Sequence, residues 1–134
     1  MSEYLVEIVI DIVDFAWDPD EITSLLGVAP TTVSRKGVKG NKPRAPVHNA
    51  WRIYSAPPLN WPEVLISVEA HWKELGNRLS GKEEIFRYIS EYAQVELTVI
   101  VRECDRYPLV RLPKELIKYA HEANFSRVDV DIYQ

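Results

Sequence analysis

Residues 4–27, YLVEIVIDIVDFAWDPDEITSLLG, decide the fold, because they join a regular strand to a short helix. In the first part, apolar residues recur at every second position. This alternation is typical of a β-strand, and the many β-branched residues favour it further. The opposite face carries Glu7 and Asp11 among apolar residues, so we expect that face to be partly covered. The apolar face consists of Tyr4, Val6, Ile8, Ile10 and Ile12.

The second part of this stretch predicts a helix with both ends marked. Asp18 can cap the first turn, and Pro19 suits the first helical position. Glu21 completes a capping box with Asp18. Gly27 is expected to end the helix in the left-handed conformation.

The remaining elements follow from similar signals. Strands are predicted over residues 47–55, 95–103 and 127–133. Capping boxes, Asn60 with Glu63 and Ser80 with Glu83, predict two middle helices that end near residues 79 and 92, and Gly76 is expected to interrupt the first. Residues 113–123 predict another helix, which Asn124 would end.

The order of these elements is strand, helix, strand, helix pair, strand, helix, strand. Each end of the chain combines a strand with a helix that proline begins, which predicts two βαβ-type halves. We therefore expect a single α+β domain over residues 1–134, with a ferredoxin-like antiparallel sheet and helices on one face. The middle helices would form an inserted helical hairpin.

Composition narrows the class of protein. A chain of 134 residues fits one domain, and no apolar run approaches the ~20 residues that a membrane-spanning helix needs. Acidic residues interrupt the apolar beginning, which argues against a signal peptide. The single cysteine, Cys104, fits a reducing compartment, so we expect a cytoplasmic protein without membrane contact. A net charge of −4 argues against general nucleic-acid binding.

Three segments of the chain are similar to a known family. They are DPDEITSLLGVAPTTVSRKG (18–37), NAWRIYS (49–55) and LPKELIKYAHEANFSRVDVDIYQ (112–134). Together they resemble the bacterial family called domain of unknown function 4279, over nearly the whole chain. The most specific pieces are the LGVAPT turn at 26–31 and the DIY ending at 131–133. The resemblance implies a compact α+β domain in the bacterial cytoplasm, and it supplies no catalytic residues.

The stretch 27–51 is the longest without a helical or strand pattern, and its charge is one-sided. No Asp or Glu occurs from Ile22 to Pro62, so residues 22–62 have a formal charge of +6 while the rest of the chain carries −10. Such a loop could bind an anion or an acidic partner, with Gly37 and Gly40 letting backbone N–H groups approach a phosphate. It matches no phosphate-loop motif, and it could instead be a solvated loop or fold back on the acidic body. The candidate binding residues are Arg35, Lys36, Lys39, Lys42, Arg44 and His48.

Carboxylates on the strands form a second candidate group. Asp11, Asp129 and Asp131, with Glu7 and Glu96, could hold a divalent ion if the first and last strands were neighbours. The alternative is a solvated sheet face on which these carboxylates pair with arginines. The arginines concerned are Arg52, Arg102 and Arg127.

Residues that often carry catalysis are isolated in this sequence. His48, His71 and His121 share no metal-ligand spacing, and Cys104 has no Cys or His nearby. We therefore predict no metal, no cofactor and no catalytic residues.

Two tryptophans next to turns, Trp17 and Trp61, are candidate interface aromatics. The sequence as a whole favours a non-enzymatic interaction module, of which an immunity protein is one version, with the basic loop at 35–44 meeting an unknown protein partner. The alternative is a binder of an anionic small molecule, or a small enzyme acting on one, at the same loop. A homodimer through a sheet edge or an open sheet face is compatible with either.

Overall fold

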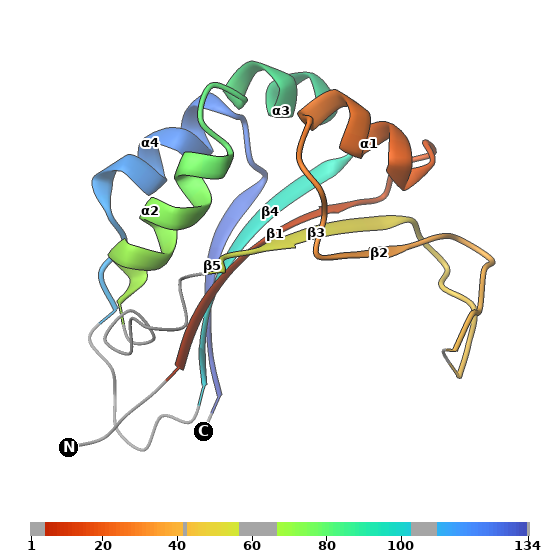
Figure 1. Cartoon of the computed structure of the whole chain (residues 1–134), viewed down its shortest axis with the longest axis horizontal. Helices are drawn as coiled ribbons and strands as arrows, with labels where there is room; N and C mark the ends of the chain where they lie inside the picture. The colour runs from red at the N-terminus through yellow and green to blue at the C-terminus, as the bar shows by residue number, and fades with distance from the viewer. Residues whose placement is uncertain (1–4, 42, 57–66, 103–109, 134) are drawn as a thin grey trace.

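The computed structural model describes residues 5–41, 43–56, 67–102 and 110–133, and it shows a five-stranded sheet with four helices on one side (Figure 1). The fold is therefore α+β, as predicted. In chain order the elements are β1 (Leu5–Val13), α1 (Pro19–Leu26), β2 (Thr32–Ser34), β3 (Ala50–Tyr54), α2 (Val68–Arg78), α3 (Glu83–Ile89), β4 (Gln94–Arg102), α4 (Lys114–Glu122) and β5 (Arg127–Ile132).

The strand order is β2-β3-β1-β4-β5, with β1 at the centre. β1 pairs antiparallel with β3 and β4, and β2 pairs antiparallel with β3. β5 lies parallel to β4. The expectation of a fully antiparallel sheet is therefore wrong at this edge, because α4 carries the chain back over the sheet so that β5 runs in the same direction as β4.

The core lies between the sheet and the helices. On β1 the side chains of Val6, Ile8, Ile10 and Ile12 are between 0% and 2% exposed, which confirms this part of the predicted inward face, while Tyr4 lies outside the described residues. Trp51 and Ile53 of β3, and the alternate residues of β4 from Val95 to Val101, complete the sheet side of the core. The opposite face of the sheet carries the half-buried carboxylates of β1, and it is partly covered, as predicted, because Val9 and Ile100 on this face are only 4% and 8% exposed.

Two βαβ units are present, but they differ in kind. β1 and β2 are both antiparallel to β3, so they run parallel to each other with β3 between them. β4 and β5 are direct parallel neighbours joined by α4. The ferredoxin-like arrangement and the inserted hairpin are not confirmed, since α3 packs against α1 and α4, and α2 packs on β1.

The ends of the helices show which of the predicted caps are present. Asp18 accepts the N–H of Asp20, and Gly27 adopts φ 71°, as predicted. The capping box at Ser80 is wrong, because Gly81 turns the chain with φ 78° and Lys82 precedes α3 without a side-chain cap. The Asn60–Glu63 box lies outside the described residues.

Other elements also differ from their predictions. β3 is Ala50–Tyr54 instead of residues 47–55, because residues 47–49 belong to the loop before it. α2 runs through Gly76, because this residue faces the ring of Trp72 and the surrounding contacts hold the helix. β2 was not predicted, because three residues are too few to show a period. No helix in the described ranges combines the length and the apolar character needed to cross a membrane.

Candidate functional site

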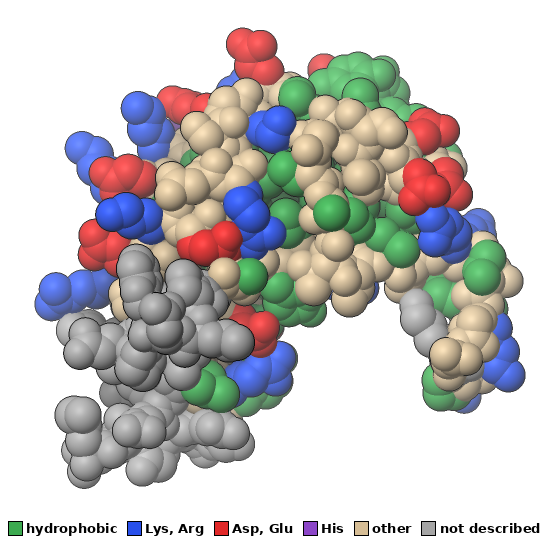
Figure 2. All heavy atoms as spheres, in the orientation of Figure 1, with side chains coloured by type: hydrophobic (Ala, Val, Ile, Leu, Met, Phe, Trp, Pro, Cys, Tyr) green, Lys and Arg blue, Asp and Glu red, His purple; other side chains and the backbone are tan. Residues whose placement is uncertain are grey.

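The predicted basic loop is an arm that leaves the sheet between β2 and β3 (Figure 1). We call residues 35–49 the basic hairpin. Ser34 and Ala50 pair at its base, and the N–H of Gly37 donates to the carbonyl oxygen of Pro46 at 2.9 Å. Gly37 and Gly40 have φ values of 77° and 54°, which glycine adopts without strain. Figure 2 shows Lys and Arg side chains along this arm.

Asn49 fastens the base of the basic hairpin to the body. Its Oδ1 accepts the N–H of Lys36 at 2.7 Å. Its Nδ2 donates to the carbonyl oxygens of Phe15 and Trp17, at 3.0 and 3.1 Å. No local signal in the sequence marks this residue, because its contacts on the body are more than 30 positions away along the chain.

Arg35 folds back onto the acidic start of α1. Its Nε lies 3.3 Å from Oδ2 of Asp18, and its Nη2 lies 2.9 Å from Oδ1 of Asp20. The hydrogen bond to Asp18 is the main cause that raises the pKa of Arg35. The pKa of Asp18 is lowered, first by the N–H of Asp20 and then by Arg35. Arg35 therefore anchors the basic hairpin to the body.

His48 also faces an acidic residue, since its Nδ1 lies 3.1 Å from Oδ1 of Asp14. The two residues flank an open depression of about 420 Å³ at the root of the basic hairpin. Arg35 and Arg44 do not line it, so the predicted binding residues do not converge on one point. The depression is lined by Asp14, Phe15, Ala16, Lys36, Val47, His48 and Asn49.

The remaining cations of the basic hairpin lie on its surface. Lys36, Lys39 and Arg44 are exposed and form no ion pair with any residue that the structure describes. Lys42 lies outside the described residues. Val38 and Val47 are 57% and 71% exposed, so the arm also offers apolar side chains.

An aromatic cluster lies where α1 and α3 meet. We give this name to Trp17, Tyr88 and Tyr92. The rings of Trp17 and Tyr88 are stacked with centroids 6.0 Å apart, and Tyr92 lies 5.2 Å from Trp17. Tyr88 and Tyr92 are about half exposed, and Trp17 is partly buried. The interface role of Trp17 stays a prediction, and Trp61 lies outside the described residues.

The strand carboxylates pair with arginines on the face of the sheet opposite the helices. Arg52, Asp11, Glu96 and Arg127 form a row across β3, β1, β4 and β5. Arg52 Nε lies 2.5 Å from Asp11 Oδ1, and Arg127 Nη2 lies 2.8 Å from Glu96 Oε1. Burial is the main cause that raises the pKa of Asp11, against the effect of Arg52, and neighbouring Glu96 raises it further.

This pairing accounts for the carboxylates better than a metal site does. β4 separates β1 from β5, so Asp11 faces Glu96 instead of Asp129 or Asp131. Within the described part of the chain, no group of three or more His, Cys, Asp and Glu side chains could hold a metal ion.

A buried Ser–His contact was not visible in the sequence. Ser55 Oγ lies 2.7 Å from His71 Nδ1, and the N–H of Ile8 donates to the same hydroxyl at 2.9 Å. Ser55 and His71 are only 7% and 2% exposed. Their position inside the core, where β1, β3 and α2 meet, favours a structural role.

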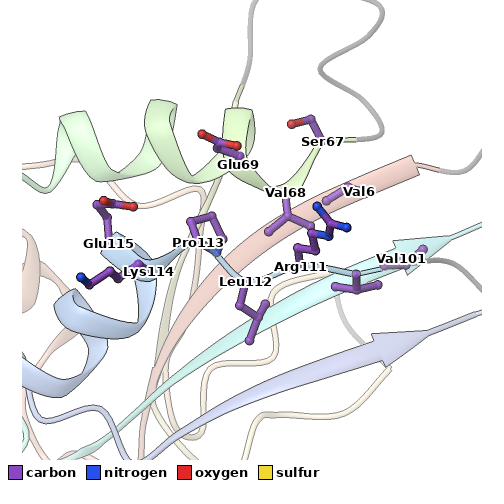
Figure 3. A pocket seen from close by; sticks show the side chains of 11 residues that line it. Val6, Ser67, Val68, Glu69, Val101, Arg111, Leu112, Pro113, Lys114 and Glu115 are labelled. Carbon is purple, nitrogen blue, oxygen red and sulfur yellow. The ribbon is translucent and has the colours of Figure 1, made fainter.

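The starts of α2 and α4 enclose another depression, of about 480 Å³ (Figure 3). Arg111 and Lys114 line it together with Glu69 and Glu115, so its charge is mixed. The other residues that line it include the apolar side chains of Val6, Val68 and Val101. The arrangement favours neither an anion nor a cation.

No curated protein and no solved structure matches the chain. A family model described as Domain of unknown function (DUF4279) matches residues 3–134. This match covers essentially the whole chain, as the resemblance of its segments predicted, and the protein therefore belongs to the DUF4279 family.

Proposed function

We propose that this protein is a non-enzymatic interaction module of the bacterial cytoplasm whose basic hairpin meets an acidic partner protein. The observation that carries the proposal is the exposure of Lys36, Lys39 and Arg44, which form no ion pair with any described residue, on an arm that leaves the sheet. An arm with separated cations can follow an extended acidic surface. A small anion, in contrast, requires cations that converge on one point.

The attachment of the arm supports the same function. Asn49 and Arg35 hold its base in a fixed position, so fewer degrees of freedom are lost on binding. The aromatic cluster includes Trp17, which is close in sequence to the acidic residues that Arg35 contacts, Asp18 and Asp20. We expect these rings to form a second part of the contact surface.

The scaffold also suits this role. The order β2-β3-β1-β4 supports its description as a ferredoxin-like unit with inserted helices, extended at one edge by β5. Small rigid α+β domains of this kind serve as immunity proteins, and this remains an analogy of type. The alternative ligand is a small anion bound by Lys36 and His48, but Asp14 lines the same depression and disfavours it.

The test is affinity capture from the native cytosol with the full chain as bait. The hairpin variant carries Lys36→Glu, Lys39→Glu and Arg44→Glu, and it leaves the Arg35 anchor intact. The control variant carries the same change in charge at exposed helix residues, Lys73→Glu, Lys114→Glu and Lys118→Glu. We expect wild type and control to retain an acidic protein that the hairpin variant loses, and higher salt to release it.

Two results would overturn the proposal. One is that wild type and hairpin variant retain the same proteins, and the other is that wild type retains none. Titration with inorganic phosphate tests the alternative, since binding that depends on Lys36 and His48 would favour a small-anion site.

A further inference from the structure

The two edges of the sheet are built differently. β2 has only three residues and leads directly into the basic hairpin, so it offers little backbone to another strand. β5 has six residues, RVDVDI, and contains no proline. The free side of an edge strand presents backbone N–H and C=O groups that can pair with a further strand. Within the described part of the chain, β5 is thus the edge that offers more backbone to a further strand.

β5 also exposes apolar side chains on the face that should be buried. Val130 and Ile132 lie beside Val99 and Val101 of β4, on the same face as the core. Val99 and Val101 are both 0% exposed, whereas Val130 is 39% and Ile132 is 49% exposed. The helical layer therefore covers β4 and stops short of β5. An additional strand beside β5 would cover Val130.

The charges on the other face of β5 suit a second copy of the same strand. Arg127 and Asp131 lie four positions apart on the outer face, with Asp129 between them. In antiparallel pairing about a twofold axis through Asp129, each Arg127 lies opposite Asp131 of the second copy. Only the two Asp129 residues then face a like charge, and each Asp129 already has the Nε of its own Arg127 at 3.7 Å.

The competing register is less favourable. A twofold axis through Val130 gives the same overlap within β5, but it places Asp129 opposite Asp131 of the other copy twice. It also leaves Arg127 opposite Tyr133. Like charges directly opposite each other destabilise a strand pair, so the register through Asp129 is preferred.

We propose that two copies of this protein pair through β5 in antiparallel orientation, with Asp129 on the twofold axis, Arg127 opposite Asp131, and Val128 of each copy against Val130 of the other. The sheet then continues across both copies, with the helices of both on the same side. A contact through one edge strand is small, so the dimer is concentration-dependent. The basic hairpin lies at the opposite edge and remains accessible.

Sedimentation velocity of the full chain over a range of concentrations tests the dimer. We expect wild type to shift from monomer to dimer, and Val130→Lys to raise the dissociation constant about tenfold or more, because a charge replaces a buried methyl contact. The matched control is Val47→Lys on the basic hairpin, which should dimerise like wild type. Circular dichroism spectra should show that both variants are folded.

Disulfide trapping tests the register. In a Cys104→Ser background, Asp129→Cys brings two thiols to directly opposed positions, where the Cα separation of an antiparallel pair permits a disulfide. Asp131→Cys should not cross-link to its own copy, because its opposite residue is Arg127. We expect the first variant to form a covalent dimer upon oxidation and the second to stay monomeric on a non-reducing gel.

The outcomes that overturn the proposal are distinct. They are a wild type that stays monomeric throughout, a dimer that Val130→Lys leaves unchanged, and cross-linking at residue 131 without cross-linking at residue 129. A monomeric wild type that loses a cytosolic partner only upon Val130→Lys would also overturn it, and would assign β5 to a strand of another protein.

Discussion

Ser55 Oγ lies 2.7 Å from His71 Nδ1 in the interior of the protein, and this contact closes the end of the β1–β3 ladder. The hydroxyl also accepts the N–H of Ile8, while the N–H of Ser55 donates to the carbonyl oxygen of Ile8. Ser55, the residue directly after β3, therefore joins β3 to β1 and to α2. In a buried position, the loss of either group leaves a polar atom without its partner.

Ser55→Ala is expected to lower the free energy of unfolding by about 1–3 kcal/mol, because the buried N–H of Ile8 and the imidazole of His71 lose a shared hydroxyl. Urea denaturation followed by circular dichroism measures this. The control is Ser24→Ala at an exposed position of α1, where we expect a change within about 0.5 kcal/mol. Equal values for the two variants would show that the contact contributes nothing.

The elements with a regular period could be predicted from the sequence. In β1 every second residue is apolar because one face of the strand is buried along its whole length. The ends of α1 depend on the side-chain cap at Asp18 and on the left-handed backbone of Gly27. β2 has no such pattern, since its three residues depend on pairing with β3. The position of β5 directly beside β4 was also hidden, because a strand–helix–strand order predicts parallel strands but not whether they are neighbours.

The candidate site likewise has features that the sequence predicts and features that it does not. The one-sided charge of the basic hairpin is a property of the composition and was visible at once. The roles of its members were not, since the contacts of Arg35 with Asp18 and Asp20 depend on how the chain folds. Asn49 and the Ser55–His71 pair are ordinary polar residues until distant segments meet, so no local signal could have singled them out.

Thr23→Val should destabilise the protein by about 1–3 kcal/mol, because it removes the acceptor of a buried donor. Trp51 is fully buried, and its Nε1–H donates to Thr23 Oγ1 at 3.0 Å, which joins β3 to α1. Thr23→Ser keeps the hydroxyl and should unfold close to wild type. Urea denaturation of both variants measures the difference. An equal loss in the two variants would show that this hydrogen bond is not the cause, because serine keeps the hydroxyl and valine keeps the methyl group.

Gly27→Ala should lower the free energy of unfolding by about 1–2 kcal/mol through backbone strain. Gly27 has φ 71°, and a Cβ there would meet only Lys82 Nζ, at 3.6 Å, so packing is not the obstacle. Asparagine tolerates this conformation better, and Gly27→Asn should cost clearly less. Thermal unfolding of the pair gives the comparison, and an equal loss for both variants would exclude φ as the reason.

Asp11→Asn should become progressively more stable relative to wild type as the pH rises from below 3.8 towards neutrality. The raised pKa of Asp11 means that the native state holds its proton more tightly than the unfolded chain, whose carboxyl has the ordinary value of 3.8. The resulting stabilisation is complete below 3.8, and it is lost as the pH rises through the native pKa. Urea denaturation at several pH values measures the difference between the two proteins.

At low pH the two proteins should be alike, because a protonated carboxyl resembles the amide. Glu84→Gln at an exposed position of α3 serves as the control and should follow wild type. If the stability of wild type instead rises relative to that of Asp11→Asn with increasing pH, the effect of Arg52 on the pKa of Asp11 outweighs the effect of burial.

Asn49→Ala should loosen the basic hairpin while its charge stays the same. The substitution removes the acceptor of the Lys36 N–H and both donors to the carbonyl oxygens of Phe15 and Trp17, so the arm keeps its pairing at Ala50 but loses its lateral support. Hydrogen–deuterium exchange with mass spectrometry should show faster exchange in peptides that cover 35–49, and little change in those that cover β4.

Asn49→Asp separates the two sides of this support, because the carboxylate can still accept from Lys36 but cannot donate to the two carbonyl oxygens. We expect exchange intermediate between wild type and Asn49→Ala. Any acidic partner captured by the basic hairpin should bind Asn49→Ala more weakly than wild type, since a mobile arm loses more conformational entropy on binding. Unchanged exchange in 35–49 would mean that Arg35 alone positions the arm, through the two carboxylates at the start of α1.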